Sequence, residues 1–186
     1  MKIKKIEKIC KATGQIVTVE ANEELFIGSA KALYLASRRY SGFRTDDFLD
    51  FFGIYGKEAD KFFCDELVSE DFIYMDSFRG EKEVFDTGIE IDIFGTLLKI
   101  FRAKDANIYF VPSVYLSGYK NDKDELYFTV RENWLAVKRG MYLDGIIQIM
   151  DENNYPKVYE ECKKYLEEIF GKFKEVKNGE QTCLDG

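Results

Sequence analysis

The side chains in this sequence that could do chemistry are carboxylates. They gather in three groups, namely Glu90 with Asp92, Asp122 with Asp124 and Glu125, and Asp151 with Glu152. Carboxylates alone can hold Mg²⁺ or hydrolyse a glycoside, provided that two or three of them converge. Nothing in the spacing joins the groups, and charges that alternate along a strand are typical of the solvated face of an antiparallel sheet. The pattern therefore predicts solvated surface, with neither a metal site nor a cofactor.

Histidine is absent from the chain. This removes the side chain whose pKa best suits proton transfer near neutrality, so triads of the Ser-His-Asp and Cys-His kinds are excluded. Neither of the glycine-rich phosphate motifs, GxxxxGK[ST] and GxGxxG, occurs. The four cysteines lie far apart without a CxxC pair, which favours reduced thiols over a zinc site or a disulfide framework. We predict that the protein is not an enzyme and that it works by binding another macromolecule.

One basic cluster, SRRYSGFR at residues 37–44, is interleaved with aromatic residues. Its Arg38, Arg39 and Arg44 could contact phosphates while Tyr40 stacks on a base. The alternative is a solvated loop whose arginines pair with the acidic surplus elsewhere. The net charge of −7 argues against a protein that coats nucleic acid. It leaves open a local basic strip that faces DNA and an acidic surface that faces a basic protein groove.

Periodicity predicts an α+β fold of two small lobes that position these side chains. The N-terminal lobe, residues 1–76, is expected to begin with a helix over 3–12, because Ile6 and Ile9 lie on one helical face and Gly14 follows. The other elements predicted in this lobe are strands at 15–20 and 25–35, helices from 46 to 66 and a strand at 71–75.

The C-terminal lobe, residues 77–186, is expected to be an antiparallel sheet with a docked terminal helix. Ile89 to Ile93 alternates with period two before a Phe94-Gly95 turn, which predicts a hairpin with one wet face. An apolar stripe over 155–176 predicts the helix. The charged stretch 77–83 is expected to connect the lobes. Strands are predicted at 89–93, 97–101, 107–111, 126–130, 134–138 and 142–150.

The composition is that of a folded protein, with 46% hydrophobic and 16% aromatic residues. No run of 18 or more apolar residues occurs, and lysines interrupt the apolar residues of the opening MKIKKIEKIC. These features predict neither a membrane span nor a signal peptide. A cytoplasmic protein with a macromolecular partner is therefore expected.

The order of four segments resembles a family of prophage proteins of about this length, carried by phages of Gram-positive gut bacteria. These segments are KIEKICK at 5–11, FIG and ALYL within 26–35, DFLDFF at 47–52 and AVKRGMYLDGIIQIM at 136–150. The resemblance spans nearly the whole chain. Some members of such families look like type II anti-CRISPR proteins, which bind the RNA-guided effector nuclease and block target cleavage. The resemblance therefore implies a phage-encoded inhibitor in the cytoplasm of a bacterial host.

Two sets of residues are the candidate contacts for such a partner. The acidic pair Glu90 and Asp92 would face a basic channel of the effector, while the loop residues Arg38, Arg39, Tyr40 and Arg44 would grip nucleic acid. As an alternative, the C-terminal lobe is similar to a repeat of bacterial sliding clamps. That alternative predicts a replication accessory protein that associates with DNA and forms a homodimer or a ring.

Overall fold

The computed structural model describes residues 2–21, 23–68, 82–119 and 126–180. Its helices are α1 (Ile3–Thr13), α2 (Thr45–Phe51), α3 (Ser113–Leu116) and α4 (Pro156–Glu180), and its 3₁₀ turns are η1 (Arg38–Tyr40) and η2 (Gly56–Lys61). The first strands are β1 (Gln15–Ala21), β2 (Glu24–Ser29), β3 (Ala32–Leu35), β4 (Phe63–Val68) and β5 (Lys82–Ile93). The later strands are β6 (Thr96–Ala103), β7 (Ile108–Pro112), β8 (Leu126–Arg131), β9 (Trp134–Arg139) and β10 (Tyr142–Gln148).

These strands form one ten-stranded sheet in the order β4-β1-β2-β3-β10-β9-β8-β5-β6-β7. Neighbours are antiparallel except β1 and β4, which are parallel. The mixed α+β fold predicted from the sequence is thereby confirmed. Strand β3 pairs with β10 over Tyr34, Leu33 and Ala32, so the strands of both predicted lobes belong to one sheet. The predicted boundary at 76/77 and the predicted strand at 71–75 lie outside the described residues.

The main hydrophobic core joins the first three α-helices to strands along the whole sheet. Ile6 and Ile9 of α1, Phe48 of α2 and Tyr115 of α3 belong to it, together with residues from every strand except β4. The helical spacing of Ile6 and Ile9 explains why α1 packs as predicted, and Gly14 ends the helix with a φ of 64°. Beyond β10, the N–H of Met150 donates to the carbonyl of Phe110 on β7 at 2.9 Å. The strands from β10 to β7 therefore curve, so that the edge strand β7 contacts the residues that follow β10.

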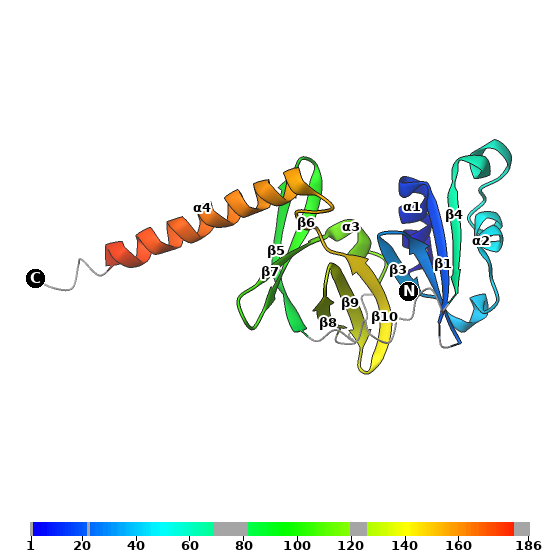
Figure 1. Cartoon of the computed structure of the whole chain (residues 1–186), viewed down its shortest axis with the longest axis horizontal. Helices are drawn as coiled ribbons and strands as arrows, with labels where there is room; N and C mark the ends of the chain where they lie inside the picture. Colours follow the sequence, from blue (N-terminus) through cyan, green and yellow to red (C-terminus); the bar gives the residue numbers. More distant parts are fainter. Residues whose placement is uncertain (1, 22, 69–81, 120–125, 181–186) are drawn as a thin grey trace, which may run out of the picture.

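Helix α4 contacts the sheet through its first turns. Cys162 is fully buried in a cluster with Ile91 and Leu98 of the β5–β6 hairpin, and Val158 and Leu166 pack against that cluster. Figure 1 shows the rest of the helix running away from the sheet. The helix is thus present where the apolar stripe predicted it, and its contact with the sheet is made near its N-terminal end.

The helix predicted as far as residue 66 is wrong in its second half. Helix α2 ends at Phe51, the short turn η2 follows, and Phe63–Val68 is strand β4, parallel to β1 at the edge of the sheet. In strand β4, Phe63 is 55% exposed. Phe62, Phe63 and Leu67 therefore do not share the buried apolar face that a helix would have given them. An edge strand buries only part of its side chains, and its apolar residues can then occur at spacings that imitate a helix.

Candidate partner-binding surfaces

The predicted basic loop forms η1, directly after β3. Tyr40 is only 3% exposed, and its ring lies 5.4 Å from the ring of Phe43 and 5.7 Å from that of Phe48, measured between centroids. The guanidinium of Arg39 stands over the Tyr40 ring at 4.6 Å. Tyr40 therefore anchors the loop in the core, and in this conformation its ring does not offer a face for base stacking.

The three arginines of this loop are exposed but have different surroundings. The backbone N–H of Arg44 donates to the Asp47 carboxylate at 2.8 Å, which satisfies a free donor at the start of α2. Arg38 lines a groove beside the β1–β2 hairpin. In the sheet, β10, β9 and β8 lie between β3 and β5. The structure therefore places the arginine loop and the Glu90–Asp92 pair on separate surfaces.

The groove beside Arg38 has a volume of about 630 Å³, and we call it the acidic groove. It is lined by Glu20, Glu23, Glu24, Leu25, Leu35, Ala36, Ser37, Arg38 and Ser41. The N–H of Ala36 donates to the carbonyl of Leu25 at 2.7 Å, which holds the chain after β3 against the β1–β2 hairpin. The groove thus contains three carboxylates and one guanidinium, and Leu25, Leu35 and Ala36 supply apolar lining. In the sequence these glutamates look like the polar residues of an ordinary hairpin, so no local pattern marks them as part of a site.

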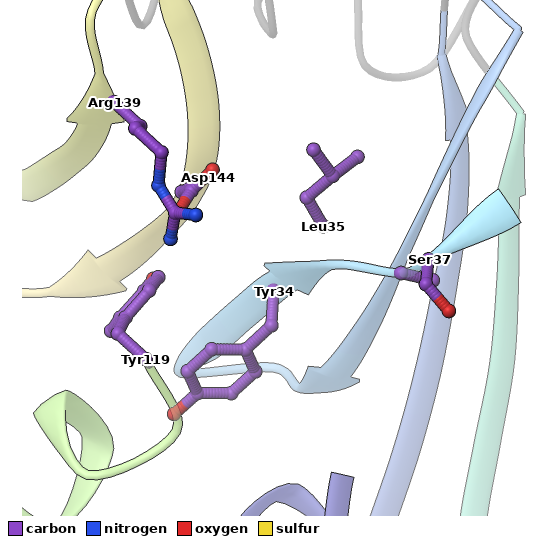
Figure 2. Close-up of a pocket in the computed structure, with 7 residues that line it drawn as sticks. Tyr34, Leu35, Ser37, Tyr119, Arg139 and Asp144 are labelled. Carbon is purple, nitrogen blue, oxygen red and sulfur yellow. The ribbon is translucent and has the colours of Figure 1, made fainter. Parts of the chain in front are cut away.

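A smaller pocket of about 200 Å³, which we call the tyrosine pocket, shares Leu35, Ala36 and Ser37 with the acidic groove. Figure 2 shows Arg139 and Asp144 together on one side, Tyr119 next to them and Ser37 on the opposite side. The Arg139 Nη2 and Asp144 Oδ2 atoms are 2.7 Å apart, and the Tyr34 hydroxyl donates to the Tyr115 carbonyl at 2.7 Å. The two cavities adjoin along the chain that leaves β3.

A β-bulge in β10 positions the carboxylate of the tyrosine pocket. Leu143 pairs with Lys138 and Gly145 pairs with Val137, so Asp144 is an extra residue in its strand. Such a bulge re-aims side chains, and here it brings Asp144 to Arg139. Gly145 follows with a φ of 155°, and a Cβ on it would overlap the Leu33 carbonyl oxygen. The close approach of β10 to β3 therefore requires glycine at this position.

The tyrosine pocket contains two buried phenols and an ion pair. Burial raises the pKa of Tyr34 and of Tyr119 well above the ordinary value, and a neighbouring ionisable group adds to the effect in each case. Both hydroxyls therefore stay protonated near neutral pH and cannot serve as proton acceptors for a reaction. Asp144 is paired with Arg139. These residues offer hydrogen bonds and charge to a ligand but no activated nucleophile.

Glu90 and Asp92 lie on one face of β5, as their spacing predicts. Glu90 accepts a hydrogen bond from the Ser113 hydroxyl at 3.2 Å, and Asp92 accepts one from the N–H of Gly95 at 2.8 Å. Lys99 on β6 is 2.9 Å from Asp86 and 4.0 Å from Glu90. Lys99 thus neutralises only part of the charge of Asp86 and Glu90, and Asp92 adds a third carboxylate on this strand, so the surface keeps a negative charge.

Among the residues that the structure describes, no three Cys, Asp or Glu side chains are placed to hold a metal ion. Asp151 accepts hydrogen bonds from the N–H groups of Asn153 and Asn154, and the predicted group at 122–125 lies outside the described residues. Within the same described ranges, no helix has the length and apolar character needed to cross a lipid bilayer. Comparisons of the chain with models of protein families, with curated proteins and with solved structures found no match.

Proposed function

We propose that this chain is a non-enzymatic binding protein whose acidic groove receives a basic segment of its partner. The observation that carries the proposal is the lining of that groove, which holds three carboxylates, Glu20, Glu23 and Glu24, and one cation, Arg38, together with apolar side chains. Opposite charges across an interface speed the encounter and fix its register. A net negative groove with Leu25 and Leu35 at its base suits a lysine- or arginine-bearing segment that also carries apolar side chains.

The partner that we propose is the RNA-guided effector nuclease of a type II CRISPR system, in the cytoplasm of a bacterial host. Support comes from the four segments that resemble prophage proteins and from the net charge of −7, which suits a basic nucleic-acid channel. In this proposal, residues 1–76 and 77–186 act as two lobes, and α4 docks on the second. The first lobe presents the acidic groove and the arginines of η1, and the second presents Glu90 and Asp92.

A target-cleavage assay with purified effector and added protein tests this function. We expect cleavage to fall as protein is added. The variant E20Q/E23Q/E24Q should weaken inhibition roughly 3- to 100-fold, because each exposed charge pair contributes about 0.2–1 kcal/mol. The matched control, E58Q/D60N/E167Q, removes three exposed carboxylates from η2 and α4 and should inhibit like the unchanged chain.

Undiminished cleavage in the presence of excess protein, for effectors from several hosts, would contradict the proposal. If cleavage falls, the arginine loop can be tested separately. Charge reversal at Arg39 and Arg44, which do not line the acidic groove, should weaken inhibition if the arginines of the loop grip the guide or target backbone. Unchanged inhibition by that variant would assign the loop to solvent.

A clamp-like replication accessory protein is the second candidate function. The observation that favours it is the pairing of β3 with β10, which joins the strands of both halves into one continuous sheet. This function predicts a homodimer or ring in sedimentation and DNA association that weakens steeply with salt. It also predicts no effect on effector cleavage, so the same assay separates the two functions.

A further inference from the structure

Strand β5 extends well beyond the neighbour that pairs with one of its edges. β8 pairs with β5 only over Lys82–Val84, whereas β6 pairs with it as far as Ile93. Beyond Val84, no described residue outside the β5–β6 hairpin pairs with the backbone of β5. We call the stretch Ile89–Ile93 the free edge of β5. It lies in the part of the hairpin beside α4 (Figure 1).

The hairpin turn determines which backbone groups of the free edge are available. Phe94 and Gly95 form a two-residue turn with φ angles of 52° and 77°, and Ile93 pairs with Thr96 across it. The pair next to such a turn is hydrogen-bonded, and hydrogen-bonded and open pairs then alternate. Asp92 and Glu90 therefore occupy non-hydrogen-bonded pairs with their partners on β6. Their N–H and C=O groups point away from β6, and within residues 2–21, 23–68, 82–119 and 126–180 no backbone group pairs with them.

Side chains along the free edge alternate in character as well. Glu90 and Asp92 project from one face, while Ile91 and Ile93 project from the other. Ile89 belongs to the stretch between Asp86 and Glu90 in which the register with β6 shifts. Ile91 is buried under α4, but Ile89 is 48% exposed. Any strand laid beside β5 would meet carboxylates on one face and apolar side chains on the other.

The turn at the end of the free edge contains an aromatic residue that is exposed to solvent and has a positive φ angle. Phe94 is 75% exposed although its φ is positive, a conformation in which asparagine or glycine is usual at this type of turn. Leu97, which pairs with Asp92, is 46% exposed. Natural proteins normally cover or charge an apolar edge of this kind, and the Phe94 side chain has little contact within its own chain.

We propose that the free edge of β5 receives, as an additional strand, a partner segment in which lysine or arginine alternates with apolar residues. Its basic side chains would face Glu90 and Asp92, its apolar ones would lie on the face of Ile91 and Ile93, and its backbone would pair with the edge. A second copy of this chain fits less well, because symmetric antiparallel pairing centred on Ile91 would oppose each Glu90 to the Asp92 of the other copy. This inference rests on the proposed function, since it gives the partner a second, strand-like contact.

The test uses the full chain and a labelled hexapeptide of alternating lysine and valine, with binding measured by fluorescence anisotropy. We expect the peptide to bind and to slow hydrogen exchange at the backbone amides of Glu90 and Asp92. The variant E90Q/D92N should weaken binding about 2- to 30-fold, because it removes two cross-strand charge pairs. Asparagine at position 92 keeps the acceptor for Gly95. The control E58Q/D60N, which also removes two exposed carboxylates, should bind normally.

Two further measurements keep the outcomes distinct. Glu90→Pro removes an outward N–H that makes no bond to β6, so it should abolish binding while the thermal unfolding transition stays cooperative. A peptide of alternating glutamate and valine should not bind. Equal affinity for E90Q/D92N, or protection confined to other amides, overturns the inference. So does a dimer in sedimentation that protects the same amides without peptide, because the edge then belongs to a second copy. If E90Q/D92N still inhibits the effector as well as the unchanged chain does, the strand contact with the effector is contradicted, while the proposed inhibitory function is not.

Discussion

Substitution of Gly145 tests the closest contact in the sheet, where β10 lies against β3. A Cβ at Gly145 would overlap the Leu33 carbonyl oxygen and would come within 2.5 Å of the Tyr119 hydroxyl. Gly140, in the turn of the same hairpin, provides the matched control. Its φ is 58°, and a Cβ there would meet nothing within 4 Å. Gly145→Ala and Gly140→Ala therefore add the same methyl group to a strained backbone, with and without a steric neighbour.

The expected magnitudes differ clearly. Gly140→Ala should cost about 1 kcal/mol, since the left-handed conformation costs roughly 1–2 kcal/mol and the stiffer unfolded chain returns part of it. Gly145→Ala should cost about 3–5 kcal/mol, because overpacking adds roughly 1–3 kcal/mol and a conformation reserved for glycine adds a similar amount. The carbonyl that the methyl group meets belongs to the backbone of β3 and cannot turn aside.

Urea unfolding followed by tryptophan fluorescence measures both costs, because Trp134 lies on β9 next to β10. With a slope of about 2 kcal/mol/M, the midpoint should fall by about 0.5 M for Gly140→Ala and by about 1.5–2.5 M for Gly145→Ala. Equal midpoints for the two variants would refute the close approach of β10 to β3. Crystallography of Gly145→Ala, if it folds, should show the two strands displaced at this point.

Two further predictions concern buried contacts in the N-terminal half. Burial raises the pKa of the Cys10 thiol from its ordinary value of 9.0 to about 12. Between these values the folded thiol keeps its proton and the unfolded one loses it, so stability is lost as pH rises, by up to about 1.4 kcal/mol per pH unit. Cys10→Ala should show a shallower loss in urea midpoints between pH 8 and 10. Glu66 Oε1 accepts from the N–H and the hydroxyl of Thr45 at 3.0 and 2.9 Å. Glu66→Ala should therefore cost about 1–2 kcal/mol in thermal unfolding, and Glu66→Gln less, because the amide oxygen still accepts; equal losses would contradict this role.

Elements with a strong local pattern could be predicted from the sequence. Ile6 and Ile9 recur at helical spacing before Gly14, and these residues form the buried face and the end of α1. The alternation before Phe94 and Gly95 produced the β5–β6 hairpin, with Glu90 and Asp92 on one face as expected. In both cases, neighbours within a few positions determine the structure, so the pattern alone was enough.

Strand β4 could not be predicted, because its partner is distant in the sequence. Its pairing with β1 is parallel and aligns Phe63 with Gln15 and Cys64 with Ile16. Cys64 is exposed in this strand. Nothing within a few residues of Phe63 distinguishes an edge strand from the second half of a helical pair.

The candidate site was predicted only in part. Composition drew attention to Tyr40 as a stacking residue, but Phe43 and Phe48 supply a local aromatic cluster that buries its ring. That cluster could have been recognised from the density of phenylalanine after the loop. The acidic groove could not, because Glu20 and Glu24 face Arg38 only once the chain after β3 lies against the hairpin.

The join between β3 and β10 also has a consequence for the order of folding. Only three residue pairs connect these strands, and their members lie on the order of 100 positions apart in the chain. The β1–β2–β3 and β8–β9–β10 meanders contain only contacts between neighbouring strands, so they should form in an early kinetic phase. The join then closes late, and until it does both meanders present unpaired strand edges. Refolding at high protein concentration should therefore lose material to aggregation during the slow phase, before the sheet becomes continuous.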